Sequence, residues 1–336
     1  MKPTGNASRI LQIHPSRRCN LQCLHCYSSS SPEERDELSI ALLLQALTDA
    51  SEEGYTVASF SGGEPLLYQP LYELLERARS CGLVTTVTSN GMLLNERHLE
   101  RLRHTVDLLA ISLDGVPASH NRMRASAQAF DTMVARLEGV RKSGIPFGFI
   151  FTLTQYNLNE LDWVANFALE QGAKLLQIHP LEEIGRGKQL LSGARPDKLE
   201  SVYAYLEVSR LQAAVGNQLY IHLDLVNREN LRLNPSQVLA DKPPVDKMRH
   251  LLADIVSPLI IEADGTIVPL EHGFARKYAL GNLQEAALHD LAIRWCRERY
   301  QSFRDLCQQV FEDVTASGNP PFTNWYEAIS HQAENG

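Results

Sequence analysis

Cys19-Asn20-Leu21-Gln22-Cys23-Leu24-His25-Cys26-Tyr27 is the segment on which the fold assignment rests. It places three cysteines in a C-x3-C-x2-C spacing, a few residues after a short strand-like run, Ile10-Leu11-Gln12-Ile13. Three thiols in one polar, arginine-flanked loop are not the composition of a hydrophobic core. Thiolates are ligands for soft metal centres, so the spacing predicts metal chemistry at the end of a strand.

A structural zinc ion is one candidate for this loop. Such an ion takes four ligands, usually from paired C-x2-C motifs. The nearby fourth candidate is His25, which lies between two of the cysteines. Three ligands and a vacancy suit an iron–sulfur cube better, because one iron then stays open for a substrate or cofactor.

Composition narrows the class of protein. The chain has 336 residues and six cysteines, too dilute for a disulfide scaffold. Its 32 basic and 40 acidic residues give a net charge of −8, which argues against nucleic acid as a partner. The N-terminus lacks a secretory signal, and no stretch approaches the ~20 apolar residues of a membrane span. We therefore predict a cytoplasmic protein without a membrane partner, in which clustered thiols bind metal.

Strand-like and helix-like segments alternate along the first 180 residues. Helices with one apolar face, most of them followed by glycine, separate six predicted strands. The strands are 10–13, 57–60, 84–88, 108–113, 147–153 and 175–178, and the helices are about 40–53, 70–80, 96–104, 130–143 and 158–171. This alternation predicts a parallel sheet, either open or a partial barrel, with its functional loops at the C-terminal strand ends.

The rhythm changes after Pro180. Glycines indicate loops at 185–187 and at Gly193, and a helix is predicted from Asp197 to about Ala214. A strand-like run covers 219–226, and 230–244 is polar and interrupted by prolines. Residues 259–268 are typical of a β-hairpin with an Asp-Gly turn, and the remainder is predicted to be helical up to a polar tail.

Further motifs follow the strands in order, and with them the sequence resembles the radical S-adenosylmethionine (radical SAM) superfamily. The family signature is C-x3-C-x2-C followed by an aromatic residue, here Tyr27. Ser61-Gly62-Gly63-Glu64-Pro65 matches the GGEP motif, Thr88-Ser89-Asn90-Gly91 a TNG-like segment, and Ser112-Leu113-Asp114-Gly115 the SLDG segment, with His120 and Arg124 behind it. For the last two segments, simple turn chemistry is the alternative explanation.

The resemblance implies a partial (β/α)6 barrel over residues 1–195. It implies that Cys19, Cys23 and Cys26 hold one [4Fe–4S] cluster, and that SAM binds the open iron. Expected SAM contacts are Tyr27, Gly62, Gly63, Glu64, Pro65, Ser89, Asn90, Ser112, Asp114 and Arg186. An electron from an external flavodoxin- or ferredoxin-type reductant then cleaves SAM, and the resulting 5′-deoxyadenosyl radical abstracts hydrogen from a substrate. For Arg186, a solvated loop charge is the alternative.

Residues 196–336 resemble, more loosely, the α+β SPASM extension of peptide-modifying members. The similarity lies in residues 260–269 and in Leu280-Gly281-Asn282-Leu283. Those relatives carry cysteines for auxiliary clusters, whereas this chain has Leu270 at the first such position and Val310 three residues after Cys307. We therefore expect a SPASM-like extension without an auxiliary cluster.

The resemblance implies that the substrate is a ribosomally synthesised peptide or a protein side chain. Few residues precede the first strand, so a separate protein is expected to deliver the peptide if there is one. The alternative is a small molecule in cofactor or tetrapyrrole biosynthesis. A more remote alternative is a non-catalytic iron–sulfur or zinc module, against which the Gly63-Glu64 pair argues.

Three further residues are candidates for catalysis. His179 follows the sixth strand and is a candidate acid or base, with a structural role as the alternative. Cys296 and Cys307 are candidate hydrogen-atom donors, although free cysteines usually serve as buried apolar residues.

Overall fold

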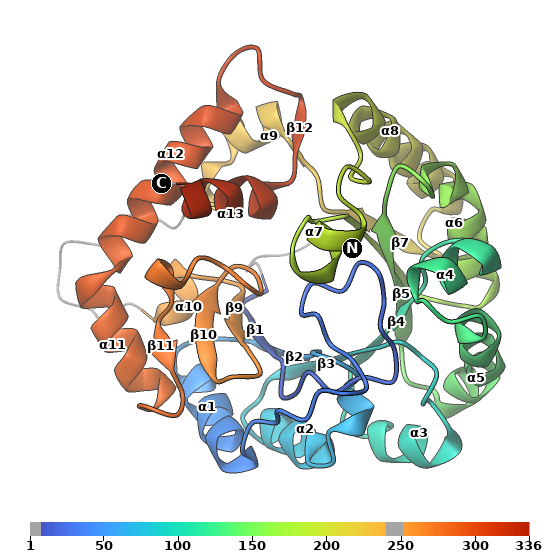
Figure 1. The fold of residues 1–336 in the computed structure, drawn as a ribbon, viewed down its shortest axis with the longest axis horizontal. Helices are drawn as coiled ribbons and strands as arrows, with labels where there is room; N and C mark the ends of the chain where they lie inside the picture. Colours follow the sequence, from blue (N-terminus) through green and yellow to red (C-terminus); the bar gives the residue numbers. More distant parts are fainter. Residues whose placement is uncertain (1–7, 240–250, 336) are drawn as a thin grey trace.

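A ten-stranded sheet forms the centre of the computed structural model, which describes residues 8–239 and 251–335. Its order is β11-β10-β9-β1-β2-β3-β4-β5-β6-β7, and neighbours from β1 to β7 are parallel. Figure 1 shows the strands as a ring with helices around its outside. The parallel strands are β1 (Ile10–Ile13), β2 (Val57–Phe60), β3 (Val84–Ser89), β4 (Leu108–Ser112), β5 (Phe147–Leu153), β6 (Leu175–Pro180) and β7 (Tyr220–Leu223).

The predicted alternation of strands and helices is confirmed over the first 180 residues. Helices α1 (Ile40–Glu52), α2 (Leu71–Ser80), α3 (Glu96–Leu102), α5 (Ala129–Ser143) and α6 (Leu161–Glu170) connect the strands. They cover the outward face of the sheet, where alternate strand residues are fully buried. One such contact joins Phe149 of β5 to Phe167 of α6, with ring centroids 5.7 Å apart. The short helix α4 (Pro117–Met123) was not predicted.

The C-terminal segment extends the same sheet at both edges. The predicted hairpin is β9 (Leu259–Ile261) and β10 (Thr266–Pro269), and β9 pairs in parallel with β1. On the same side, β11 (Gly281–Asn282) pairs with β10 and ends the sheet. At the opposite edge, β7 pairs with β6. Residues after 195 thus complete the sheet that the earlier residues begin, and the domain boundary at 195 stays a prediction.

Helices of the C-terminal segment cover the gap in the ring between β7 and β11 (Figure 1). β8 (Val226–Asn227) pairs with β12 (Phe322–Thr323), and this short ladder joins the C-terminal helices to the chain that follows β7. A capping box, in which Asp197 and Glu200 bond each other's backbone, starts the predicted helix α8. The α-helices after residue 195 in the described part of the chain are α8 (Lys198–Val215), α9 (Arg228–Leu233), α10 (Leu252–Ile255), α11 (Leu288–Glu298), α12 (Tyr300–Thr315) and α13 (Trp325–Asn335).

Two expectations for the C-terminal half need correction, and one segment without a predicted element contains a helix. The glycine-rich segment predicted as a loop begins a short helix, α7 (Gly185–Leu190). The polar segment 230–244 contains most of α9, and its residues 240–244 lie outside the described part of the chain. The expected polar tail is helical up to Asn335, because α13 buries Trp325, Ile329 and Ala333 against the core.

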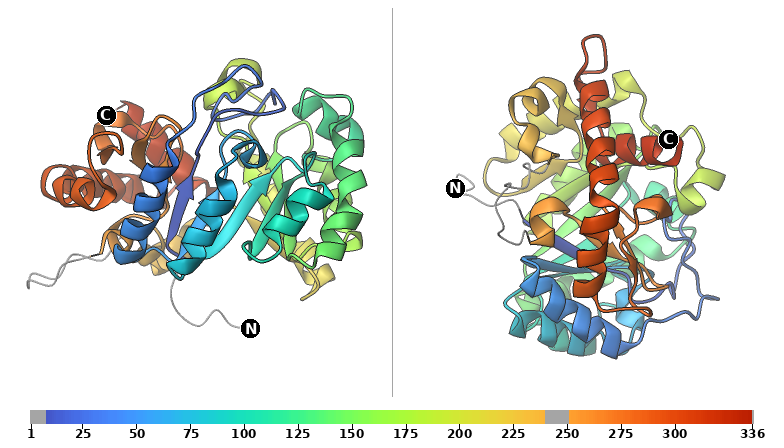
Figure 2. Two further views of the ribbon diagram at one scale, coloured as in Figure 1. Left: turned by 90° about the horizontal axis from the view of Figure 1, so that it is seen from below. Right: turned by 90° about the vertical axis from the view of Figure 1, so that its left-hand side faces the viewer.

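The C-terminal ends of the parallel strands meet at one rim of the ring. The loop of residues 14–39 and helix α7 rise from this rim (Figure 2). Every predicted motif of the first half follows one of these strand ends, as expected for a parallel sheet. In the part of the chain that the structure describes, no helix combines the length and apolarity needed to cross a membrane.

Candidate active site

The three cysteines of the loop after β1 gather above the rim. Cys19 and Cys23 are each 8% exposed and pack with Leu21, while Cys26 and Met92 lie against them. Burial raises the pKa of Cys19 to about 12, and the carboxylate of Glu64 adds to the effect. These thiols come from one loop, and the fold encloses them together.

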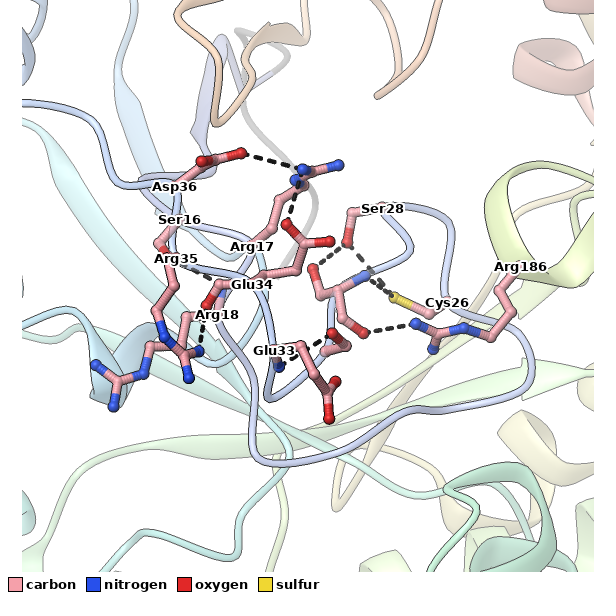
Figure 3. Close-up of polar contacts among 12 residues, drawn as sticks. Ser16, Arg17, Arg18, Cys26, Ser28, Glu33, Glu34, Arg35, Asp36 and Arg186 are labelled. Carbon is pink, nitrogen blue, oxygen red and sulfur yellow. Dashed lines mark hydrogen bonds and ion pairs between the residues drawn. The ribbon is translucent and has the colours of Figure 1, made fainter.

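Hydrogen-bond donors point at two of the sulfur atoms. The backbone N–H of Ser30 lies 3.3 Å from Cys26 Sγ, and a guanidinium nitrogen of Arg124 lies 3.7 Å from Cys23 Sγ. Ser28 Oγ is 3.5 Å from Cys26 Sγ (Figure 3). Burial makes the thiolate form costly without a cation, and such donors stabilise it. The donor set therefore fits a metal centre that binds thiolates.

A single metal ion fits this geometry less well than an iron–sulfur cube. Among the residues that the structure describes, no three His, Cys, Asp or Glu side chains are arranged to hold one ion together. A cube binds each thiolate through a different iron and does not require the sulfurs to converge on one point. His25 is also engaged elsewhere, as described below. The three cysteines thus fit the [4Fe–4S] cluster that the sequence resemblance implies.

Two arginines hold the cysteine loop in shape. Arg17 pairs with Glu34 at 2.8 Å and with Asp36 at 3.1 Å within the loop (Figure 3). From α7, Arg186 donates from its guanidinium to the carbonyls of Cys23 at 2.8 Å and Ser30 at 2.7 Å. Because loop carbonyls occupy its guanidinium, Arg186 is not the solvated charge of the alternative interpretation, and this placement favours a positioning role.

Gly185, at the start of α7, lets the helix approach the cysteine loop. Its φ is +54°, and a Cβ at this position would lie 2.1 Å from the carbonyl oxygen of Tyr27. The backbone of the cysteine loop cannot move away from Gly185 without displacing Cys26. The Cys26 carbonyl accepts a hydrogen bond from the backbone N–H of Arg186 at 2.9 Å. Only glycine fits this contact.

We expect Gly185→Ala to lower cluster occupancy strongly, because α7 must withdraw from the cysteine loop. Gly193→Ala is the matched control, since Gly193 also has a positive φ of +75° but open space around its Cα. The control should cost about 1–2 kcal/mol of stability from its backbone conformation and keep its cluster. Iron content and visible absorbance of both variants test this, and equal losses in the two would contradict the contact argument.

Glu64 of the GGEP-like motif is a buried carboxylate whose charge acts on the Cys19 thiol. It is 2% exposed and accepts hydrogen bonds from Ser89 Oγ at 2.9 Å, Asn90 N at 2.9 Å and Leu66 N at 3.2 Å. Burial raises its pKa to about 7, and these donors oppose the rise. Motif residues after β2 and β3 thus lie together, as the sequence predicted.

The glycines of this motif place it against the cysteine loop. A Cβ on Gly63 would lie 2.2 Å from the carbonyl oxygen of Arg18, and one on Gly62 would lie 2.7 Å from that of Ser16. Pro65 follows at the start of a 3-10 turn, η1 (Pro65–Leu67), which Glu64 caps. The backbone therefore passes the cysteine loop more closely than any side chain would allow.

Tyr27 and Ser112 lie at the same rim. The Tyr27 hydroxyl is 3.3 Å from Ser61 Oγ, and burial raises the pKa of this phenol. The Tyr27 ring contacts the rings of His14 and His272, with centroids 5.6 and 5.3 Å away. Ser112 ends β4 and is 8% exposed. Both residues stay predicted cofactor contacts.

Asp114 of the SLDG-like segment lies in a buried ion network. It is 0% exposed, and its Oδ2 lies 2.6 Å from Arg124 Nε and 3.3 Å from His25 Nε2. Burial by itself would raise the pKa of Asp114, but Arg124 and His25 outweigh burial and hold it well below its usual value. Since Arg124 also reaches Cys23, this network connects the segment after β4 to the cysteine loop.

The three candidate catalytic residues lie in different places. His179 is the last residue but one of β6, its side chain is 40% exposed, and its Nδ1 forms an ion pair with Asp224. Cys307 packs into the main hydrophobic core from α12. Cys296 is an exposed residue of α11, but its thiol is partly shielded from water. This shielding and the charge of Glu53 raise its pKa. The structure does not bring either cysteine to the cysteine loop.

Sequence reasoning missed four ionisable residues near His179: Glu182, Asp224, Glu271 and Tyr326. Asp224 forms the ion pair with His179. The charges of His179 and Asp224 act on the pKa of Glu182, that of Glu182 acts on Glu271, and all three carboxylates act on Tyr326. Glu182 follows β6 directly, which was an available signal. The others come from the C-terminal segment, and no local motif marks them.

Residues 13–168 match the family model of the radical SAM superfamily. An AdoMet-dependent heme synthase of Methanosarcina barkeri is 31% identical over 187 residues, which are 55% of this chain and 54% of the relative. The Fe-coproporphyrin III synthase of that organism is 29% identical over 53% of this chain and 45% of its own length. A PqqA peptide cyclase of Xanthomonas campestris is 26% identical, over 61% and 56%. The chain thus spans about half the length of these curated relatives.

Two solved structures share the fold. SuiB of Streptococcus suis, bound to S-adenosylmethionine, matches with a TM-score of 0.68 at 17% identity, over 88% of this chain and 68% of SuiB. The structure of anSMEcpe with bound AdoMet matches with a TM-score of 0.67 at 18% identity, over 97% and 96%. At such identities the likeness concerns the fold, including the C-terminal extension.

Proposed function

The core of this chain, residues 13–168, belongs to the radical SAM superfamily, and we propose that the protein is an enzyme that cleaves SAM reductively with one [4Fe–4S] cluster. The observation that carries the proposal is the enclosure of three thiols beside the buried carboxylate of Glu64. When bound, the cluster and SAM supply a 5′-deoxyadenosyl radical that removes a hydrogen atom from an unreactive C–H bond.

Cys19, Cys23 and Cys26 would hold the cluster, and the GGEP-like loop would hold SAM. Glu64 is suited to bind a cation. Burial raises its pKa to about 7 when no ammonium group lies beside it. The amino group of SAM would favour the ionised carboxylate, while Ser89 and Asn90 keep its orientation. Arg186 keeps the cysteine loop in place, and Asp114 keeps Arg124 near Cys23.

We expect Glu64→Gln to weaken SAM binding by roughly thirtyfold or more, because loss of one member of a buried charge pair costs about 2–5 kcal/mol. The amide keeps the shape of the carboxylate and its place beside the thiols. Glu73→Gln, on the neighbouring helix α2, is the surface control and should bind SAM normally. Equilibrium binding of SAM to both reconstituted variants checks this, and wild-type affinity in Glu64→Gln would remove Glu64 from the SAM site.

Two substrate classes are candidates. The curated relatives named as heme and Fe-coproporphyrin III synthases favour a small tetrapyrrole-type substrate. A ribosomally made peptide, possible with a separate peptide-binding protein, is the second candidate, and the likeness to a PqqA peptide cyclase favours it. With either substrate the enzyme needs an external one-electron donor of the flavodoxin or ferredoxin type. We place the reaction in the cytoplasm.

Anaerobic reconstitution followed by reduction in the presence of SAM tests the enzyme proposal. We expect formation of 5′-deoxyadenosine and about four irons per chain. If a fully loaded cluster yields no 5′-deoxyadenosine, the remaining interpretation is a non-catalytic iron–sulfur module. About eight irons per chain would contradict the single cluster that the missing auxiliary cysteines predict.

A further inference from the structure

One buried side chain connects the ion network around Asp114 to a predicted cluster ligand. Arg124, the residue after helix α4, directs its Nε to Asp114 Oδ2 at 2.6 Å and its Nη1 to Cys23 Sγ at 3.7 Å. The side chain of Arg124 is 11% exposed, and that of Asp114 is 0% exposed. Because a guanidinium carries several N–H donors in one plane, a single arginine can serve the carboxylate and the sulfur together.

The backbone next to each partner holds Arg124 at Cys23. The N–H of Leu24 donates to the carbonyl of Met123 at 2.9 Å, which joins the residue after Cys23 to the residue before Arg124. The side chains of Met123 and Leu24 also pack against each other in a small apolar cluster. The guanidinium therefore reaches the sulfur from a backbone that is itself bonded to the cysteine loop.

Two other arginines close to the cysteine loop have different partners. Arg186 donates to backbone carbonyls, and Arg17 pairs with carboxylates within the loop. Arg122, two residues before Arg124 and also from α4, is exposed and lies over the ring of Tyr156, 4.9 Å from its centroid. One short helix thus presents a buried arginine to the sulfur and an exposed arginine to the surface.

The charge of Arg124 acts on the sulfur that it approaches. Burial raises the pKa of Cys23, and Arg124 opposes this rise, whereas Cys26 and Asp114 add to it. Arg124 therefore stabilises negative charge on the Cys23 sulfur. Water and salt screen such an interaction only weakly at a buried site.

We propose that Arg124 raises the reduction potential of the cluster by holding a positive N–H donor at Cys23 Sγ, and that Asp114 is the positioning residue for this donor. The proposal rests on the enzyme function proposed above. Reduction passes one electron from the external donor to the cluster, and no bond in the protein forms or breaks. The added electron increases the negative charge shared with the thiolates, so a positive donor at one sulfur stabilises the reduced state more than the oxidised state.

Potentiometric titration of the reconstituted protein, followed through the electron paramagnetic resonance signal of the reduced cluster, tests the proposal. We expect Arg124→Leu to lower the equilibrium constant for reduction at least tenfold, which is about 59 mV for a one-electron couple. Arg122→Leu is the matched control, because it removes an exposed positive charge from the same helix. Its potential should equal that of the wild-type protein.

A double variant keeps the test decisive if Arg124→Leu does not fold around its cluster. Asp114→Leu/Arg124→Leu removes both members of the buried pair and leaves no unpaired charge. Its potential should still lie below the wild-type value, because the donor that contacts the sulfur is gone. The fall should be smaller than in Arg124→Leu, in which the remaining carboxylate of Asp114 adds a negative charge.

The sign of the change separates the loss of the donor from a loss of structure. Water that enters a loosened site stabilises the more negative, reduced cluster, so disorder by itself would raise the potential. A double variant with a potential equal to or above the wild-type value would overturn the proposal, and so would an equal fall in Arg122→Leu. About four irons per chain and 5′-deoxyadenosine formation by the wild-type protein would then leave the enzyme function intact, whereas their absence would overturn both.

Discussion

Cys23→Ala is expected to yield protein without the visible absorbance of an iron–sulfur cluster and without 5′-deoxyadenosine formation. Two remaining thiolates cannot hold a cube that needs three protein ligands and one open iron. Cys23 is also the cysteine whose sulfur Arg124 approaches, so its removal leaves that guanidinium without its sulfur partner. Iron content, absorbance and product analysis of the reconstituted variant measure the loss.

Cys81→Ala is the matched control for this experiment. Cys81 is a partly buried thiol at the end of α2 and lies outside the cysteine loop. The control should retain about four irons per chain and full SAM cleavage. A Cys23→Ala protein that keeps its iron, or a Cys81→Ala protein that loses it, would contradict the ligand assignment.

Arg124→Leu is the substitution with the largest expected effect on stability. It leaves Asp114, at 0% exposure, with a buried negative charge that keeps His25 and the backbone N–H of Thr152 as neighbours but loses its arginine. Removal of one partner from a buried ion pair typically costs about 3–5 kcal/mol. We therefore expect a loss of this size in the free energy of unfolding, measured by urea denaturation of cluster-free protein under anaerobic conditions.

Two variants show whether the loss comes from the unpaired charge. The double variant Asp114→Leu/Arg124→Leu removes both charges and should recover most of the stability. Lys142→Leu breaks an exposed pair with Glu138 on α5 and should cost less than about 0.5 kcal/mol. If the double variant is as unstable as Arg124→Leu, packing rather than charge explains the effect.

The sequence predicted the barrel and the cofactor loops because both depend on local patterns. Strands β2 and β5 match their predicted ranges, since apolar runs bounded by turn residues mark a buried strand wherever it packs. The cysteine spacing and the Gly63-Glu64 pair are equally local. Their meeting at one rim follows from a general property of parallel sheets, in which all C-terminal strand ends lie on the same side.

Local patterns failed where distant contacts decide the structure. The glycines of Gly185-Arg186-Gly187 predicted a loop, but the segment is helical and packs on the backbone of Tyr27. Asp114 read as a turn residue or a cofactor contact, and only the fold shows that Arg124 and His25 surround it. In both cases a contacting residue lies in another segment of the chain. Spacing within a motif contains no information on how close two segments come in the fold.

The sequence by itself determined the resemblance to the radical SAM superfamily and predicted three cysteines and a glutamate as its site, because these motifs are continuous and have a fixed spacing. Only the tertiary structure decided that β7 and β9 extend the two edges of the barrel and that Asp114 lies beside Arg124 and His25. The physical reason is that β1 and β9 stand about 250 residues apart in the sequence and pair only after the C-terminal segment has packed against the ring.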